Sequence, residues 1–364
     1  MNILITGSNG FIGKNFKYYL KTKKKIKVFE YKRNNPKTLL LKKIKKANVI
    51  LHFAGENRSD KKNNFFKNNF GLSKLISENA KSNSLIIFSS TTKISEKTDY
   101  GVSKINAEKI LKKNKKKNNY DLVILRLTNV FGKWSKPNYN SVVATFCYNA
   151  SRNIKSKIFQ PNAKLKLLYI DDLINQVMSI IENRKYEMYP KIKKINSIKL
   201  NSLYDKIYSF NEQRINLKTD VVKNSLDKKI YSTYLTFVPV NKFVINYKKN
   251  VDKRGNFSEL LRSNNNGQVS YFSINPGETR GDHFHFTKVE RFFPVSGKGT
   301  IIYKNIQNHK VKKYDFNSKK PEIYETIPGW SHKLVNKEKT EAIFVLWTNE
   351  IFDKKNPDTY YYDQ

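Results

Sequence analysis

The sequence has little cysteine, few acidic residues and no long apolar run. Its one cysteine, Cys147, excludes an internal disulfide framework and suits a reducing compartment. No apolar run approaches the roughly 20 residues that span a bilayer, so membrane insertion is not expected. The N-terminus begins directly with an apolar strand pattern and a glycine turn, which leaves no place for a signal peptide. We therefore expect a soluble, cytoplasmic protein.

Acidic residues are outnumbered by basic ones, 30 Asp and Glu against 70 Lys and Arg, which gives a formal net charge of +40. A field of this sign attracts phosphate backbones and anionic membranes. The lysine runs at 23–25, 42–46 and 112–117 each lie at the end or on the polar face of a predicted helix, where solvation explains them. No helix-turn-helix, zinc-finger or aromatic RNA-binding signature occurs. A phosphorylated small molecule is therefore a better partner than nucleic acid.

Two patterns divide the 364 residues. Up to about residue 180, short apolar runs alternate with helical patterns, which predicts a parallel sheet wrapped by helices. Residues 183–248 are less regular, and we expect small helices and loops there. From about residue 250, closely spaced strands separated by Gly and Asn are typical of an antiparallel barrel or jelly roll. We expect one domain over 1–245 and a second over 246–364.

A glycine-rich turn follows the first apolar run and opens an amphipathic helix. Gly7, Gly10 and Gly13 form a G-x-x-G-x-x-G pattern, which differs from the G-x-G-x-x-G of many dinucleotide sites. Such glycines allow a tight turn and close backbone approach to a pyrophosphate, which the helix N-terminus then stabilises. The cofactor contacts expected here are Gly7, Asn9, Gly10, Phe11, Ile12 and Gly13.

The end of the second predicted strand contains both residue types that distinguish NADH from NADPH, an acidic residue and an arginine. Glu30 could accept a hydrogen bond from a ribose 2′-hydroxyl, whereas Arg33 could bind a 2′-phosphate. We favour Arg33 as the phosphate partner, and hence NADPH; a solvated basic loop is the alternative.

Tyr100 and Lys104 are four residues apart on a predicted helix and therefore share one face. A free Tyr titrates near ~10, and an adjacent ammonium lowers that value by stabilising the phenolate. Tyr100 could then protonate a ketone oxygen as hydride arrives at its carbon, while Lys104 holds the nicotinamide ribose. A hydroxyl after the preceding strand would bind the substrate oxygen; we assign it to Thr91, with Ser90 as the second choice.

Together these features resemble the extended, nucleotide-sugar-modifying branch of the short-chain dehydrogenase/reductase family, over about residues 1–245. The resemblance implies a Rossmann-type α/β fold, a cofactor contact at Ala54, and substrate contacts at Arg126 and Asn129. One departure is the short spacing of nine positions between Thr91 and Tyr100. Further segments that agree are His52-Phe53-Ala54-Gly55, Asn69 at the start of a helix, Arg126-Leu127-Thr128-Asn129-Val130-Phe131-Gly132, and Tyr169-Ile170-Asp171-Asp172.

The second half contains a set of residues with metal-ligand spacing. His283 and His285, at i and i+2 on a strand, should point to one face, and Glu290 and His332 can complete the site. Imidazoles with one carboxylate suit Zn, Fe, Mn or Ni, and Zn is the commonest choice for polarising a carbonyl without redox chemistry. The alternative is a barrel whose histidines are merely core or surface residues.

This half resembles the cupin superfamily, whose two motifs match over about residues 250–350, and it implies an all-β jelly-roll barrel. The second motif normally reads P-x-G-x-x-H; Pro328 is shifted by one position, while Gly329 and His332 keep their spacing. The segment 252–259 looks like the opening strand of sugar 3,5-epimerases built on the same barrel. A plain β-turn at Arg254-Gly255 explains that segment equally well.

A reductase domain followed by a metal cupin closely resembles the bifunctional UDP-sugar reductases of bacterial capsule and O-antigen synthesis, and the segments 131–148 and 231–235 are similar to that family specifically. The resemblance implies that the cupin domain inverts C3 of a UDP-2-acetamido-2,6-dideoxy-4-hexulose. The reductase domain then reduces C4 with NADPH to the L-talose product, en route to UDP-N-acetyl-L-fucosamine. It also implies a homodimer. His285 and Glu259 are both candidates for the C3 base.

Two other interpretations remain at this stage. One is a single 4-ketoreductase activity whose cupin only binds sugar or pairs subunits. The other is a nucleic-acid-binding regulator that uses the dinucleotide fold as a redox sensor, which the absence of a nucleic-acid-binding signature disfavours.

Overall fold

The computed structural model describes residues 1–56, 65–96, 98–184, 187–220 and 224–362. By its internal contacts the chain divides into two compact units. Unit 1 comprises Met1–Tyr208 and Asn224–Pro239, and unit 2 comprises Ser209–Lys223 and Val240–Gln364. The division is therefore more complex than the single boundary expected near residue 245, because 209–223 groups with the second unit.

The core of unit 1 is a five-stranded parallel sheet with the strand order β2-β1-β3-β4-β5. Four of its strands, β1, β3, β4 and β5, are mostly buried, because helices cover both faces, and this explains why they read as near-continuous apolar runs; the edge strand β2 is largely half-buried. All five strands predicted for this region are present. They are β1 (Asn2–Thr6), β2 (Lys27–Tyr31), β3 (Val49–His52), β4 (Leu85–Thr91) and β5 (Asp121–Leu127).

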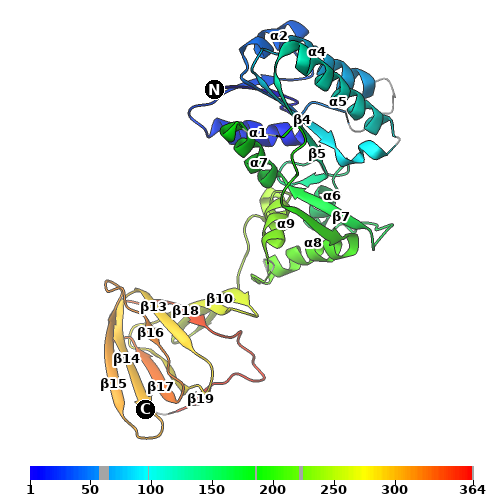
Figure 1. Ribbon diagram of the computed structural model, residues 1–364. Helices are drawn as coiled ribbons and strands as arrows, with labels where there is room; N and C mark the ends of the chain where they lie inside the picture. The colour runs from blue at the N-terminus through cyan, green and yellow to red at the C-terminus, as the bar shows by residue number, and fades with distance from the viewer. Residues whose placement is uncertain (57–64, 97, 185–186, 221–223, 363–364) are drawn as a thin grey trace. The chain divides into compact units, whose positions relative to one another are not determined.

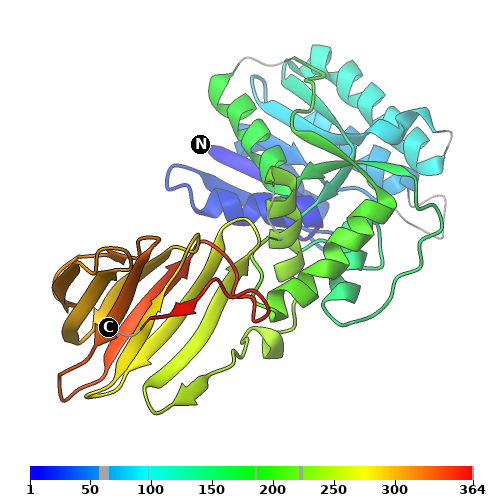
Figure 2. The same ribbon diagram turned by 90° about the horizontal axis from the view of Figure 1, so that it is seen from below.

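Helices lie on both faces of this sheet (Figure 1, Figure 2). On one face, α1 (Phe11–Lys21) and α7 (Ile170–Asn183) pack their apolar sides against the strands. On the other face lie α2 (Lys37–Lys46), α4 (Leu72–Asn79) and α5 (Asp99–Asn118). The π-helix η1 (Phe66–Gly71) leads into α4, and the short 3-10 helix η2 (Thr92–Ser95) lies between β4 and α5.

Unit 1 also contains a three-stranded sheet in the order β6-β7-β8. The expectation of only helices and loops after residue 183 is wrong for β8, which pairs antiparallel with β7. This strand has no apolar run, because its residues alternate between exposed and half-buried. The remaining elements are β6 (Asn129–Phe131), α6 (Val142–Ala150), β7 (Lys164–Tyr169), β8 (Ile195–Lys199), α8 (Leu200–Ile215), which crosses the division between units, and α9 (Ser225–Leu235).

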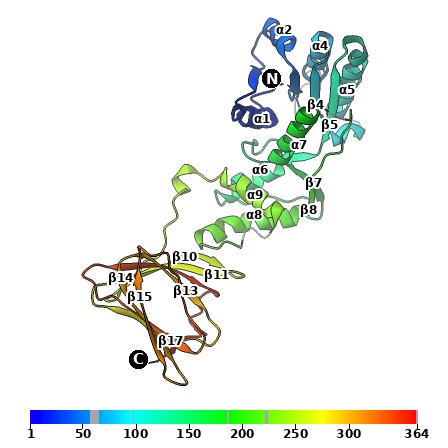
Figure 3. The ribbon, with the colours of Figure 1, turned by 60° about the vertical axis from the view of Figure 1, so that its left-hand side comes forward.

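Unit 2 consists mainly of two antiparallel sheets that form opposite walls of a barrel (Figure 3). One sheet has the order β16-β13-β18-β11-β10-β9, and the other β15-β14-β17-β12-β19. This is the all-β architecture that the closely spaced strands predict. Its elements are η3 (Val240–Lys242), β9 (Asn250–Asp252), β10 (Gly255–Ser263), β11 (Gly267–Ile274), β12 (Thr279–Phe284), β13 (Glu290–Ser296), β14 (Lys298–Asn305), β15 (Val311–Asn317), β16 (Tyr324–Glu325), β17 (Trp330–Val335), β18 (Ala342–Thr348) and β19 (Tyr360–Tyr361).

The barrel interior is filled largely by aromatic side chains. Phe344 on β18 is fully buried, and its ring stacks on Phe272 with centroids 5.0 Å apart and meets Phe316 edge-on at 4.9 Å. These rings join the two sheets, since Phe272 and Phe344 belong to one sheet and Phe316 to the other. The packed interior fixes the strands that carry the polar residues described below.

The fold has no candidate membrane span in its described part: none of the helices there is both long and apolar enough to cross a bilayer.

Replacing Phe344 by Ala should destabilise unit 2 by about 3–5 kcal/mol, because the change leaves a cavity among the stacked rings. Urea denaturation followed by fluorescence measures this loss. Phe243→Ala is the matched control, since Phe243 belongs to the same unit and is 61% exposed. Equal stability of the two variants would contradict this account of the core.

Candidate functional sites

The glycine-rich turn of unit 1 brings backbone segments unusually close together. Gly7 has a φ of +73°, and a Cβ on it would lie 2.7 Å from the backbone nitrogen of Ala54. A Cβ on Gly13 would lie 2.2 Å from the carbonyl oxygen of Gly7. The turn therefore requires glycine at both positions, and it leads directly into the N-terminus of α1.

A cleft of about 970 Å³ opens beside this turn, at the carboxyl ends of β1, β2 and β3. Of the residues expected to contact the cofactor, Gly7, Asn9, Gly10, Arg33 and Ala54 line it. The other expected contacts lie outside its lining: Phe11, Ile12, Gly13, Tyr100 and Lys104. The cleft has the size of a small-molecule site and lies at the strand ends where open α/β sheets bind ligands.

Glu30 and Arg33, the two residues at the end of β2 that could select the cofactor, have different surroundings. The carboxylate of Glu30 lies 3.0 Å from Nζ of Lys17, and this ion pair holds its pKa below the usual value although burial opposes the shift. The side chain of Arg33 is 76% exposed, and its Nη2 lies 3.3 Å from the carboxylate of Glu56. Lys32 and Lys37 line the same cleft as Arg33. An anion at this end would therefore meet several cations.

Lys104 on α5 lies behind the end of β4. Its ammonium donates to the carbonyl oxygen of Ser89 at 2.9 Å and lies over the ring of Phe88 at 4.7 Å. Burial lowers its pKa to about 8, although nearby Glu108 opposes the shift.

The pKa of Tyr100 is raised by burial, and a hydrogen bond with Thr91 offsets only part of this shift. The expected lowering of this pKa by Lys104 is not seen in the chain alone. The physical reason is that burial disfavours both the phenolate and the ammonium.

The two candidate hydroxyls at the end of β4 have separate partners. Thr91 is the hydroxyl that hydrogen-bonds with Tyr100. Ser90 instead donates to the buried carboxylate of Glu108 at 2.5 Å. The structure thus brings Thr91 to Tyr100 and turns Ser90 away.

Arg126 and Asn129, which are expected to contact substrate, form hydrogen bonds with other residues of the chain. Arg126 donates through Nε and Nη2 to the two carboxylate oxygens of Glu108, at 3.2 and 2.8 Å, and lies over the ring of Tyr189. Asn129 donates to the carbonyl oxygen of Lys166 at 3.2 Å. In the chain alone, the guanidinium of Arg126 joins β5 to α5 through Glu108, and its contact with substrate stays a prediction.

Sequence reasoning missed a buried polar chain that joins the glycine-turn strand to α5. His52 at the end of β3 hydrogen-bonds to Thr6 and to Ser73, both at 2.8 Å. Ser73 donates to the backbone of Asn69, whose side chain donates to Ser103 on α5. The signal was present in the His52-Phe53-Ala54-Gly55 segment, since a buried His at a strand end needs partners on both nitrogens.

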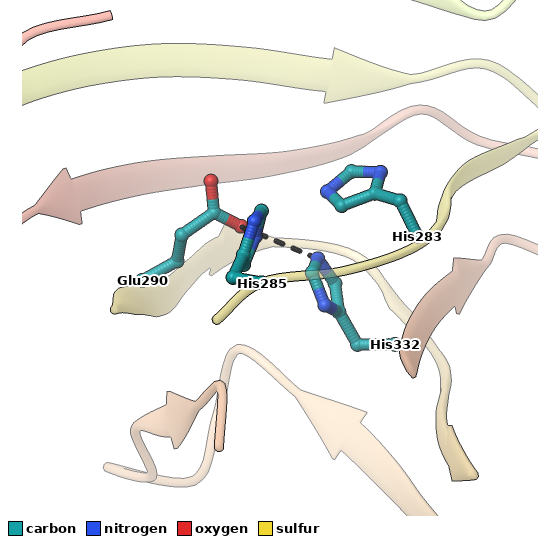
Figure 4. Close-up of side chains that lie close together, drawn as sticks. All are labelled: His283, His285, Glu290 and His332. Atoms are coloured by element: carbon teal, nitrogen blue, oxygen red, sulfur yellow. Dashed lines mark ion pairs between the residues drawn. The ribbon is translucent and has the colours of Figure 1, made fainter. Parts of the chain in front are cut away.

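In unit 2, four side chains converge inside the barrel (Figure 4). The ligand atoms of His283, His285, Glu290 and His332 all lie within 4.8 Å of one another. Oε2 of Glu290 lies 3.2 Å from Nε2 of His332 and 3.4 Å from Nε2 of His285. The four residues expected to form a metal site are therefore brought together.

A backbone irregularity produces this convergence. The register of β12 against β17 shifts between Gly281 and His283, which places His283 opposite His332. Gly281 has a φ of +106° at this bulge, and a Cβ there would lie 2.4 Å from the carbonyl oxygen of His332. His285 lies just beyond the end of β12, so simple alternation along one strand does not explain its position.

The electrostatics of the cluster suit a cation. Burial and the neighbouring His332 lower the pKa of His283 to about 3, so its imidazole is neutral and has a lone pair to offer. Burial alone would raise the pKa of Glu290, but the neighbouring His285 and His332 rings outweigh burial and hold the pKa well below the usual value. Nε2 of His285 and Nδ1 of His332 are buried and have no hydrogen-bond partner among the described residues. This donor set fits a divalent metal ion such as Zn²⁺.

Glu259, one of the two candidates for the C3 base, lies on β10 and forms an ion pair with Arg262. It does not belong to the four-residue group, and its role as the C3 base stays a prediction. His285, the other candidate, lies within the group.

Comparison with known proteins identifies two family matches. Residues 3–190 match the NAD dependent epimerase/dehydratase family, and residues 250–360 match the polysaccharide biosynthesis C-terminal domain. The chain is 35% identical to a UDP-2-acetamido-2,6-beta-L-arabino-hexul-4-ose reductase of Pseudomonas aeruginosa, over 99% of this chain and 98% of that protein.

Solved structures agree along the full length. The crystal structure of the capsular polysaccharide assembling protein CapF from Staphylococcus aureus matches with a TM-score of 0.93 and 34% identity, covering 100% of both chains. A CapF structure with the inhibitor 3-isopropenyl-tropolone matches with a TM-score of 0.87 and 32% identity, again covering 100% of both chains.

The burial of Lys104 leads to a stability prediction. With a folded pKa of about 8 and an unfolded value near ~10.4, the unfolded chain binds more protons between these two pH values, so stability rises with pH through this window. Lys104→Met removes this contribution, so its stability advantage over the natural chain should shrink by up to about 1.4 kcal/mol for each pH unit above 8. Urea denaturation of both proteins from pH 7 to 10.5 measures the difference. A difference that stays constant with pH would contradict the lowered pKa.

Proposed function

The chain belongs to the NAD dependent epimerase/dehydratase family, and we propose that it is a two-domain enzyme acting on a UDP-linked 4-keto sugar for surface polysaccharide. Its barrel domain epimerises C3 of a UDP-2-acetamido-2,6-dideoxy-4-hexulose, and its α/β domain reduces the C4 ketone with NADPH. The product is UDP-2-acetamido-2,6-dideoxy-L-talose, on the way to UDP-N-acetyl-L-fucosamine. The observation that carries this proposal is the cluster of His283, His285, Glu290 and His332 in a chain whose α/β unit presents Tyr100 and Lys104.

The reduction uses Tyr100, Thr91 and Lys104. When bound in the cleft, NADPH would supply the hydride that adds to C4. Tyr100 donates its phenolic proton to the C4 oxygen, and its raised pKa keeps that proton in place until charge develops on the oxygen. Thr91, which hydrogen-bonds Tyr100, orients the phenol. Lys104 would donate to the nicotinamide ribose, and its positive charge would stabilise the phenolate left behind.

The epimerisation uses the barrel cluster. The C4 ketone acidifies the hydrogen on C3, so a proton can leave one face of C3 and return to the other. A divalent cation held by His283, His285, Glu290 and His332 would polarise the ketone oxygen. Because reduction removes the ketone, epimerisation precedes the hydride step, and reduction then fixes the configuration at C3.

Several observations support NADPH over NADH. Glu30 is paired with Lys17, and Arg33, although it lies 3.3 Å from Glu56, is largely exposed and lines the cleft together with Lys32. The family resemblance further suggests a cytoplasmic homodimer, which light scattering of the purified protein would test.

Arg33→Ala should weaken NADPH binding roughly tenfold to a hundredfold, because a charge-assisted hydrogen bond to the 2′-phosphate contributes about 1.5–3 kcal/mol. Titration of cofactor fluorescence measures the change. NADH, which has no 2′-phosphate, is the internal control and should bind the variant as it binds the natural protein. An equal loss of affinity for both cofactors would contradict the assignment of Arg33 as the partner of the 2′-phosphate.

The two-activity proposal is tested by proton exchange without cofactor. Incubation of the UDP-linked 4-keto sugar in heavy water without NADPH should place deuterium at C3, detected by NMR. His283→Ala should reduce this exchange at least a hundredfold, because it removes one member of the cluster.

His309→Ala is the matched control, since His309 lies in the same unit outside the cluster and is exposed. Addition of NADPH should then give the C3-inverted, C4-reduced product. Reduction without any C3 exchange would favour the rival account, a single ketoreductase activity with a non-catalytic cupin.

A further inference from the structure

We propose that Asp358, in the segment 349–362 that follows β18, is a positioning residue for the metal site. It holds the turn between His285 and Glu290 and, through its own carbonyl group, the ring of His285. This inference rests on the metal site proposed above, and it extends that site to a residue that no sequence motif marks.

The backbone of Asp358 contacts a proposed ligand directly. Nδ1 of His285 lies 2.6 Å from the carbonyl oxygen of Asp358. A carbonyl oxygen only accepts, so Nδ1 of His285 is the donor and carries the proton. The lone pair of the neutral ring is then on Nε2, the nitrogen that faces Glu290. The contact thus selects the tautomer that a metal ligand requires.

The side chain of Asp358 holds the turn that follows. Its carboxylate accepts from the backbone N–H groups of Phe286, Thr287 and Lys288 at 3.1, 2.8 and 2.8 Å. It also accepts from the hydroxyl of Thr287 at 2.8 Å. Three consecutive N–H groups of the turn that joins His285 to Glu290 therefore end on one carboxylate. The path of this turn, and with it the spacing of the two ligands, depends on Asp358.

Residues on both sides of Asp358 also contact the stretch from β12 to Glu290. Lys288 donates through Nζ to the carbonyl oxygen of Pro357 at 3.2 Å and to Thr359 at 2.7 Å. On the other side, β19 pairs with β12 so that Tyr361 lies opposite His283. The segment therefore contacts the stretch that carries three of the four ligands along most of its length.

The test compares metal binding by Asp358→Ala and by the natural protein. Loss of a hydrogen-bonding partner in the outer shell of a metal site typically costs 10–100-fold in affinity, so we expect the Zn²⁺ affinity to fall by about that factor. Competition with a fluorescent chelator measures the affinity. The visible absorption of the Co²⁺-loaded protein reports the coordination geometry, and the bands should shift in the variant.

Asp358→Asn covers the case in which the Ala variant does not fold. It keeps one acceptor oxygen, so the loss of Zn²⁺ affinity should be intermediate. Asp353→Ala is the matched control in the same segment, because among the described residues the hydrogen bonds of Asp353 are local, with the backbone of Lys355 and with Asn356. It should keep the Zn²⁺ affinity and the Co²⁺ spectrum of the natural protein, and NADPH affinity should be unchanged in all three variants.

The outcomes separate the two proposals. Natural protein that binds neither Zn²⁺ nor Co²⁺ would overturn the proposed metal site and this inference with it. Natural protein that binds both ions, with Asp358→Ala and Asp358→Asn matching its affinity and spectrum, would overturn this inference alone. Slower C3 exchange with unchanged metal affinity and spectrum would also overturn it, because Asp358 would then act elsewhere than through the ligands.

Discussion

Burying the Glu290 carboxylate in the barrel removes it from water, which costs several kcal/mol unless neighbouring groups compensate. His285 and His332 approach it at 3.4 and 3.2 Å, and His283 packs against both rings. Each of these residues comes from a different place: the start of β13, the end of β12, the turn beyond it, and β17. The bulge at Gly281 and the contacts of Asp358 hold the backbone where these histidines can lie beside the buried Glu290 carboxylate.

Unit 1 also buries a charged group, in this case a cation. The Lys104 ammonium is buried behind β4, where it has a backbone carbonyl and an aromatic face for partners. Burial outweighs these partners and lowers the pKa of the ammonium to about 8. Further hydrogen-bond acceptors beside such an ammonium would stabilise its charged form.

The sequence predicted the layers of the fold because the relevant signals are local. Strands buried on both faces read as apolar runs, so β1, β3, β4 and β5 were found. β2 was also found, although it is largely half-buried, and β8 was missed because its residues alternate between exposed and half-buried. The group of His283, His285, Glu290 and His332 was predicted from spacing, although a bulge rather than strand alternation brings His283 to His332. The roles of Arg126 and Ser90 could not be read from the chain, because both depend on Glu108, a helical residue that fits equally well on a solvated face. Asp358 was missed because its partners lie about seventy positions away in sequence and no spacing links them.

The grouping of Ser209–Lys223 with unit 2 makes the chain pass between the units three times, at about residues 209, 224 and 240. Within unit 2, this segment is joined to β10, since Arg262 donates its backbone N–H to Leu217 and accepts from Thr219. Asp220 accepts from Ser263 at 2.7 Å. A barrel excised as one continuous piece from residue 246 would lack these partners and expose an edge of β10. The two units therefore cannot be separated by one cut in the chain. Gene fusions or truncations that exchange one unit must keep the segment from about residue 209 to residue 240 intact.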